Sequence, residues 1–201
     1  MPVPKGATLD PARTRAQIIE RAGPLLYARG IDGIGVAECC SVLGISKMTL
    51  YRHFGSKEGL VEAVLAERSA RVHRWLRSAA EGAGPAPADR LHAVFAALGS
   101  WYQEEAFRGC AVVNAATQSR GEHTLAIAAA HLGRYVDLFR EIAADAGAPD
   151  PDALARRLLQ VLEGATVVAA MDPVRARQAG QDAGATARLV FDQLTRDVVG
   201  P

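Results

Sequence analysis

The chain has 201 residues, a formal net charge of +1 and 49% hydrophobic residues, while only 5% of its residues are aromatic. This length is enough for one or two domains with a buried core. The sequence has no run of about 18 apolar residues, so we expect no membrane span. Residues 1–6 lack the apolar segment of a signal peptide, which predicts a cytoplasmic protein. A composition rich in Ala, Leu, Arg and Val favours helices over sheets.

The three cysteines agree with a cytoplasmic location. Cys39 and Cys40 are adjacent, a spacing that does not easily close a disulfide on a helix, and Cys110 stands alone. No CxxC or Cys/His spacing suggests zinc. We therefore expect no metal and no other cofactor.

The charge is unevenly distributed along the chain. Residues 1–60 contain eight Lys and Arg against five Asp and Glu, which gives +3, whereas residues 61–201 contain fifteen against seventeen, which gives −2. A basic N-terminal third suits a nucleic-acid-binding module joined to a near-neutral body. Chance is an equally good explanation of so small a difference.

Helical spacing of apolar residues and cap signals predict nine helices in chain order. Three Asp-Pro pairs, at Asp10, Asp150 and Asp172, read as an N-cap followed by the first helical residue. The segment 81–88 is the clearest break, because it consists of Gly, Ala, Pro and one Glu. The fold class is therefore all-α, with a non-periodic arm at residues 1–9 and helices over 10–30, 36–43, 46–54, 57–80, 89–105, 110–119, 122–146, 150–170 and 172–198.

The segment around Gly44 is the most informative part of the chain. An apolar helix end meets Gly44, and Ser46 can cap a new helix that is about two turns long and ends near Phe54. The outward side of this short helix carries Lys, Thr, Tyr, Arg and His. A short polar helix set by a tight turn against a buried partner suits insertion into the major groove of DNA.

At these residues the chain resembles the TetR family of bacterial transcriptional regulators. The resemblance rests on Gly44-Ile45-Ser46-Lys47-Met48-Thr49-Leu50-Tyr51-Arg52-His53-Phe54, on Ser56-Lys57-Glu58-Gly59-Leu60, and on Thr14-Arg15, Ile18-Ile19 and Ala28-Arg29-Gly30. It is strong over about residues 10–65, and the remainder matches in length and helical pattern. It implies a helix-turn-helix DNA-binding domain over 1–56, a connecting helix over 57–80, and an effector-binding and dimerisation domain over 89–201.

The family pattern implies roles for the residues of the short helix. Lys47 and Met48 match positions that commonly face base edges, and Thr49, Tyr51 and Lys57 match positions that commonly touch phosphates. Physical chemistry agrees for Lys57, because it stands at the start of a helix whose free N–H groups favour an anion. Met48 offers no hydrogen bond, so it could sense only a thymine methyl group or the shape of the groove.

Three further positions of this module have open roles. Arg52 either reaches DNA or belongs to a solvated face, and His53 either contacts phosphate or packs at the turn that follows. The second helix begins after Gly35, where the family usually has Thr or Ser. Because Gly supplies no hydroxyl, we expect the backbone N–H of Val36 or a neighbour to contact the phosphate in its place.

The C-terminal part holds aromatic and polar residues that could line an apolar pocket for a small-molecule effector. Packing in the core is the alternative for each of them, and it is the favoured reading for Phe95 and Met171. Cys110 is either a redox sensor or an inert packing residue. The candidate ligand-binding residues are Trp101, Tyr102, Phe107, Cys110, Asn114, Thr117 and Tyr135.

Together these features predict a ligand-responsive transcriptional regulator that is not an enzyme. Its partners would be double-stranded operator DNA, a small-molecule effector and a second copy of the chain, joined through the last two long helices. A repressor released from a near-palindromic operator is the main hypothesis. The alternatives are a dimeric interaction adaptor and a small enzyme with an appended helical module. The enzyme has little support, because the sequence contains no nucleophile elbow, phosphate-binding Gly loop or HExxH.

Overall fold

The computed structural model describes residues 10–196, and within this range the chain forms nine α-helices, one short 3₁₀ helix and no strand. The prediction of an all-α fold is confirmed. The arm predicted at residues 1–9 and the predicted end of the last helix at Val198 lie outside the described residues. The helices are α1 (Pro11–Arg29), α2 (Val36–Leu43), α3 (Lys47–Phe54), α4 (Lys57–Gly82), α5 (Pro87–Tyr102), α6 (Ala111–Gln118), α7 (Glu122–Asp145), α8 (Pro151–Met171), η1 (Pro173–Arg175) and α9 (Ala176–Arg196).

The helix starts that the sequence marks with Asp or Ser are capped as predicted. The side-chain oxygens of Asp10, Ser46, Ser56 and Asp150 accept hydrogen bonds from backbone N–H groups two or three residues further on, over 2.8–3.0 Å. Each such cap satisfies a donor that the helix itself leaves free and contributes about 1 kcal/mol. These N-cap residues thus determine where α1, α3, α4 and α8 begin.

Two boundaries differ from the prediction. Helix α5, predicted over 89–105, spans Pro87–Tyr102. It can begin at Pro87 because a proline needs no N–H partner in the first turn. Asp172 does not open the last helix directly: it caps the 3₁₀ turn Pro173–Arg175, and α9 follows from Ala176. The chain has to reverse between α8 and α9, and this tight turn accomplishes the reversal.

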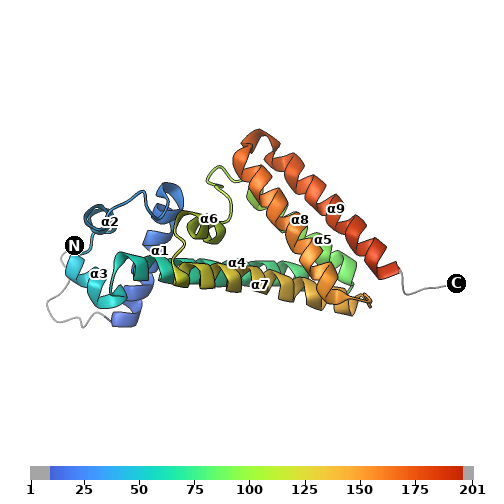
Figure 1. The fold of residues 1–201 in the computed structure, drawn as a ribbon, viewed down its shortest axis with the longest axis horizontal. Helices are drawn as coiled ribbons and strands as arrows, with labels where there is room; N and C mark the ends of the chain where they lie inside the picture. Colours follow the sequence, from blue (N-terminus) through green and yellow to red (C-terminus); the bar gives the residue numbers. More distant parts are fainter. Residues whose placement is uncertain (1–9, 197–201) are drawn as a thin grey trace.

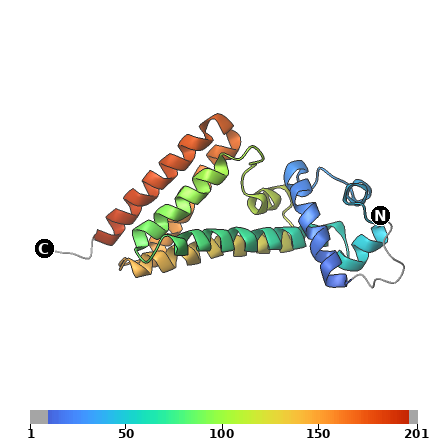
Figure 2. The same cartoon turned by 180° about the vertical axis from the view of Figure 1, so that it is seen from behind.

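The molecule is elongated, with α4 and α7 lying along its long axis (Figures 1 and 2). Helices α1, α2 and α3 gather at one end, and α5, α8 and α9 pack together at the other. Helix α6 lies between the two ends and contacts both α4 and α7. The long helix α4 therefore runs from the N-terminal end into the C-terminal helices.

Two hydrophobic clusters form the core. The C-terminal one includes Phe95, Phe139 and Leu158. The N-terminal one joins residues of α1–α4 to Cys110 and Val112 at the start of α6, so α6 packs against the helix-turn-helix end of the molecule. Movement of α6 is thereby coupled to the position of α1.

Helix α8 shows that not every residue predicted for the core is buried. Phe95 of α5 is buried, as predicted, but Met171 at the end of α8 is 77% exposed, so its assignment to the core is wrong. It extends an outward stripe with Val167 and Val168, spaced three to four residues apart as neighbours on one helix face. Between residues 10 and 196, no helix is long and apolar enough to cross a membrane.

Candidate nucleic-acid interface and ligand cavity

Helices α2 and α3 form a helix-turn-helix unit around a glycine turn. Gly44 adopts a left-handed conformation, with φ 66° and ψ 36°, which glycine reaches at little cost. Its N–H and that of Ile45 donate to the carbonyls of Ser41 and Cys40, which closes the end of α2. Leu50 of α3 is 0% exposed and packs into the N-terminal core, so the opposite side of α3 faces outward.

The outward side of α3 carries the residues that the sequence assigned to DNA. Four of these side chains are exposed to solvent: Lys47, Met48, Tyr51 and Arg52. The exposed fraction is 71% for Met48 and 49% for Tyr51. An α-helix with its side chains is about 10–12 Å in diameter, which fits the major groove of B-DNA, about 12 Å wide. The capped helix thus presents the ammonium of Lys47, the phenol of Tyr51 and the guanidinium of Arg52 to a partner.

The remaining predicted residues of this interface are half-buried. The hydroxyl of Thr49 lies 2.9 Å from Oγ of Ser46, and the His53 ring lies 6.2 Å from that of Phe54, centroid to centroid. Lys57 begins α4, and Val36 begins α2 after a Gly35 that provides no side-chain cap. These contacts allow His53 both of the roles that the sequence left open.

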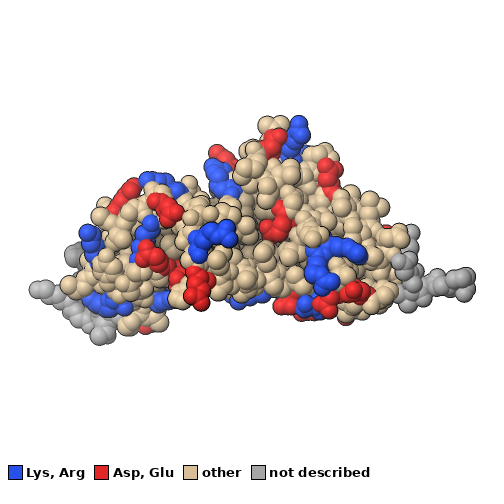
Figure 3. Space-filling model, viewed as in Figure 1, with Lys and Arg blue, Asp and Glu red and all other residues tan. Residues whose placement is uncertain are grey.

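Arg15 of α1 is a further basic residue at this end, for which the sequence predicts no role in DNA binding. Its guanidinium carbon lies 5.1 Å from the centroid of the Phe54 ring, which braces the end of α3. Figure 3 shows Lys and Arg side chains over the N-terminal end with Asp and Glu among them. The charge of this face is therefore mixed, in keeping with the small excess of +3 in residues 1–60.

The predicted ligand-binding residues fall into separate groups. Trp101, Tyr102 and Phe107 form an aromatic cluster, in which the Phe107 ring lies 4.8 Å from Trp101 and 5.3 Å from Tyr102. Tyr102 is 2% exposed, and its hydroxyl lies 2.9 Å from Oγ1 of Thr166. Burial raises the pKa of Tyr102 to about 12, so its phenol stays neutral. Thr117 is exposed, and its hydroxyl donates to the carbonyl of Asn114 on the same helix.

Cys110 and Tyr135 belong to a buried polar network centred on His131. Nδ1 of His131 lies 2.9 Å from Oγ of Ser69 and 3.1 Å from Nε2 of His73, while its Nε2 lies 3.3 Å from Sγ of Cys110. The rings of Tyr135 and His131 are 4.8 Å apart. A neutral imidazole with its proton on Nε2 would donate to Sγ of Cys110 and offer its one lone pair, on Nδ1, to Ser69 or His73.

The environment keeps this network uncharged. Burial, followed by the repulsion of neighbouring His73 and Arg134, lowers the pKa of His131 to about 3. Burial likewise raises the pKa of the Cys110 thiol to about 11. Because the thiolate is the reactive form, the thiol of Cys110 is suited to packing and poorly suited to redox sensing.

Glu163 of α8 is the least satisfied polar residue in this region. Its Oε1 is buried and has no hydrogen-bond partner among residues 10–196. Burial raises its pKa to about 6, and its carboxyl group in turn raises the pKa values of Tyr102, Cys110 and Tyr135. A buried polar atom without a partner costs free energy, so Glu163 marks a place where a ligand donor would be stabilising.

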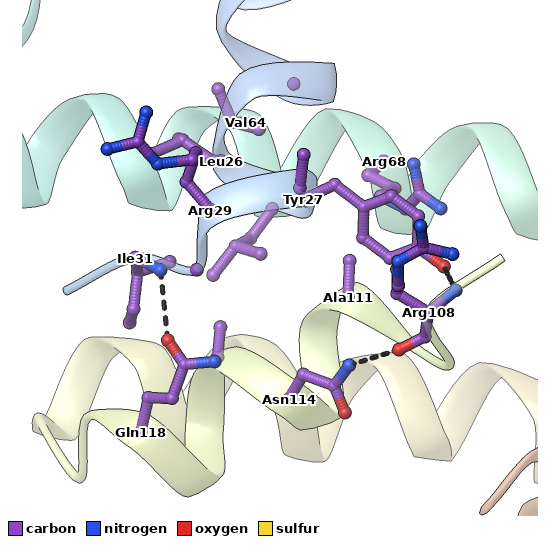
Figure 4. A pocket seen from close by; sticks show the side chains of 15 residues that line it. Leu26, Tyr27, Arg29, Ile31, Val64, Arg68, Arg108, Ala111, Asn114 and Gln118 are labelled. Carbon is purple, nitrogen blue, oxygen red and sulfur yellow. Dashed lines mark hydrogen bonds between the residues drawn. The ribbon is translucent and has the colours of Figure 1, made fainter. Parts of the chain in front are cut away.

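A cavity of about 290 Å³ lies where the end of α1, helix α4 and helix α6 meet (Figure 4). Of the predicted ligand-binding residues, Asn114 lines it. Tyr27, Arg68 and Arg108 also line it and were missed at the sequence level. They come from three segments, and the hydrogen bonds that join Tyr27 to Arg108 and to Gly109 span 81 and 82 residues of sequence, so no local pattern could have brought them together.

The fold and the capped α2–turn–α3 unit define the class of helix-turn-helix proteins. The family model described as "Bacterial regulatory proteins, tetR family" matches residues 18–64, which contain this unit. Over this segment the chain is similar to the TetR family, which agrees with the resemblance seen in the sequence.

Among curated relatives, the HTH-type transcriptional regulator TtgR of Pseudomonas putida is 40% identical over 52 residues, or 26% of this chain. That match spans only 25% of the length of TtgR.

Similarity to solved structures extends over nearly the whole chain. A TetR-family transcriptional regulator from Streptomyces coelicolor superimposes with a TM-score of 0.83 at 24% identity, covering 92% of this chain and 97% of its own. A cysteine mutant of the TetR-family regulator CifR, complexed with 26-base-pair operator DNA, gives a TM-score of 0.74 at 26% identity, covering 90% and 98%. The helical C-terminal part thus shares the fold of these proteins.

Proposed function

We propose that this protein is a DNA-binding transcriptional repressor that a small-molecule effector releases from a near-palindromic operator. The observation that carries the proposal is the geometry of α3. Ser46 caps its start, Leu50 anchors it in the core, and Lys47, Tyr51 and Arg52 face outward. The operator-bound structure of CifR, a relative of the same fold, supports the same use of this unit here.

The roles of the individual residues follow from their chemistry. Lys47 and Met48 at the tip of α3 would face base edges, while Thr49, Tyr51 and Lys57 would hold phosphates. Lysine recognises guanine or phosphate, and a phenol donates one hydrogen bond to a phosphate oxygen. Arg52 and His53 are at the edge of this surface and would add phosphate contacts, as would the backbone N–H of Val36.

The protein would act as a homodimer formed through α8 and α9. Val167, Val168, Met171 and Leu189 are 50–77% exposed on these two helices, which pack side by side. Large apolar side chains that gather on an exposed face are typical of an interface. A twofold dimer would offer two α3 helices to successive major grooves about 34–36 Å apart, which explains the expectation of a near-palindrome.

The effector would act through the C-terminal helices, where the predicted ligand-binding residues and the unpartnered Oε1 of Glu163 lie. Helix α4 extends from the helix-turn-helix end to this region, so a change in its tilt would move α3 relative to the groove. A coupling free energy of about 1–3 kcal/mol is enough for such control.

The test is a fluorescence-anisotropy titration of the protein against the DNA that flanks its own gene. If each dimer makes about eight phosphate contacts, raising the salt concentration from about 50 to 200 mM should weaken binding by about 10³–10⁵. An affinity independent of salt and of sequence would contradict the proposal and favour an interaction adaptor.

Three variants test the residue roles in the same assay. Tyr51→Phe and Lys57→Ala should weaken binding to operator and to random DNA alike, whereas Lys47→Ala should also change the base preference. Glu58→Gln, next to Lys57 and exposed, serves as the control that should not weaken binding. Normal affinity of all three test variants would refute the assignments.

A further inference from the structure

The cavity between α1, α4 and α6 has an unusual balance of charge. Three arginines line it, Arg29, Arg68 and Arg108, and no aspartate or glutamate does. Arg29 forms an ion pair with Glu38, 3.0 Å away. Among residues 10–196, no ion pair with a carboxylate is found for Arg68 or Arg108. Two of the arginines that line the cavity therefore form no ion pair with a carboxylate of the described residues.

These two arginines are held beside the same aromatic ring. The guanidinium carbon of Arg68 lies 4.2 Å from the centroid of the Tyr27 ring, and the backbone N–H of Arg108 donates to the Tyr27 hydroxyl over 2.6 Å. Nη1 of Arg108 donates to the backbone carbonyls of Glu105 and Phe107. Figure 4 shows both side chains at the Tyr27 end of the cavity, away from Gln118. A guanidinium fork fixed in this way is suited to a planar anion.

The rest of the wall is largely apolar. Leu26, Val64 and Leu65 line it and are 4–5% exposed. A volume of about 290 Å³ is at the lower end of the range for small-molecule pockets, which is about 300–1,000 Å³. The cavity thus has an apolar wall and a cationic end. The wall suits the apolar body of a small amphipathic acid, and the cationic end suits its carboxylate.

We propose that this cavity binds a small organic carboxylate, with its carboxylate against Arg68 and Arg108 and its apolar body against Leu26, Val64 and Leu65. The proposal rests on the proposed function and changes it in one respect. The effector is this carboxylate, and its site is this cavity, between the DNA-binding end and α6, in place of the residues around Glu163.

The position of the cavity gives the ligand a route to the DNA-binding end. The hydroxyl of Tyr27 donates to the carbonyl of Gly109 over 2.8 Å, and the N–H of Ile31 donates to Oε1 of Gln118 over 3.0 Å. These bonds join α1 and the loop after it to α6, and their residues border the cavity. A carboxylate that draws Arg108 towards Arg68 shifts this link, and α1 packs directly against α4.

The first experiment measures binding without DNA, by isothermal titration calorimetry of the purified protein. The probes are benzoate and hexanoate, and the uncharged analogues are benzyl alcohol and 1-hexanol. We expect at least one carboxylate to bind with a Kd of about 1 mM or tighter, and its neutral analogue to bind at least about tenfold more weakly. Absence of binding by both carboxylates, or equal binding of the neutral analogues, would overturn the proposal.

Variants locate the site. The double variant Arg68→Gln, Arg108→Gln should weaken carboxylate binding at least about tenfold. Arg74→Gln, on the same helix as Arg68 but outside the cavity, should not change it. Ala111→Leu leaves both arginines in place and fills the cavity, so it should also abolish binding. Unchanged affinity of both cavity variants would show that the carboxylate binds elsewhere.

A final titration separates this proposal from the proposed function. Operator affinity is measured with and without the carboxylate that binds, and we expect at least a fivefold decrease in its presence. Binding of the carboxylate with no change in operator affinity would refute its role as effector. Failure of the ligand-free protein to bind any operator would instead refute the proposed function.

Discussion

The hydroxyl of Tyr27 lies between two backbone groups of the segment before α6, because it accepts from the N–H of Arg108 and donates to the carbonyl of Gly109. One side chain thus joins the last turn of α1 to a segment about eighty residues further along the chain. Gly109, the acceptor, has a φ of 85°, in the left-handed region that favours glycine. Tyr27 is therefore the direct link between the helix-turn-helix end and α6.

Tyr27→Phe should remove both hydrogen bonds while keeping the ring that stacks on Arg68. We expect the free energy of unfolding to fall by about 1–2 kcal/mol, because the part-buried carbonyl of Gly109 and the N–H of Arg108 lose their partner. The melting temperature should fall by about 2–8 °C, measured by circular dichroism. Tyr51→Phe is the matched control, since Tyr51 is 49% exposed and should leave stability unchanged. Equal melting temperatures of both variants and the wild type would contradict this role.

Short-range signals were enough to predict much of the N-terminal end. Ser46, Gly44 and the apolar spacing of α2 act within a few residues, and they fix where α2 ends and α3 begins. The bounds predicted for these two helices agree with the structure to within one residue. The cavity, in contrast, depends on Tyr27 meeting Arg108, and only the packing of α6 on α1 decides this contact.

Ser46→Ala should loosen the start of α3 and weaken DNA binding. The Ser46 side chain accepts from the N–H of Thr49 over 3.0 Å, and losing such a cap costs about 0.5–2 kcal/mol. Glycine at the same position should cost only a few tenths of a kcal/mol. Urea titrations of the Ala and Gly variants, paired with operator titrations, measure both effects. An Ala variant as stable as the wild type, with unchanged operator affinity, would show that the cap is unimportant here.

His131 should make the protein less stable in weak acid. Its pKa is about 3 when folded against about 6.5 in an unfolded chain, so the unfolded state binds more protons between these values. Stability through this group is full above about pH 6.5 and is lost as the pH falls, by about 1–2 kcal/mol between pH 7 and pH 5. His131→Gln should flatten the dependence of the unfolding free energy on pH, measured by urea titration at each pH. A variant with the wild-type slope would place the pH dependence elsewhere.

Glu163, in contrast to His131, should make the protein less stable as the pH rises. Burial raises its pKa to about 6 when folded, above its value of about 4.3–4.5 in an unfolded chain, so the folded state binds more protons in this interval. Its contribution is full below about pH 4.5 and is lost as the pH rises through 6. Glu163→Gln should therefore stabilise the protein by about 1–2 kcal/mol at pH 8 and change little at pH 4.5. A destabilised variant at pH 8 would show that the carboxylate is needed there.

The predicted ligand-binding residues of the C-terminal part show that residue type alone does not distinguish a ligand site from a packed core. Tyr102 and Tyr135 were predicted for a ligand site because each brings a polar atom, but every helical core also uses such residues. The structure pairs Tyr102 with Thr166 and packs Tyr135 against His131, and it leaves Oε1 of Glu163 without a hydrogen-bond partner within residues 10–196. Satisfaction of polar atoms depends on neighbours from other helices, so Glu163 and His131 could not be singled out from the sequence.

The exposed stripe on α8 and α9 should hold the dimer together. On the last two long helices, through which we expect the dimer to form, Leu158 and Leu162 are buried within the subunit, whereas Val168 and Leu189 are 50% and 71% exposed. Val168→Glu with Leu189→Glu would place two charges in an apolar contact, and we expect a monomer by light scattering after gel filtration. Arg156→Glu, an exposed charge change elsewhere on α8, should remain dimeric. The monomeric variant should keep its helical content and lose operator affinity at least a hundredfold, because one α3 then reads one half-site. A dimer that persists in the double variant would move the interface to another face.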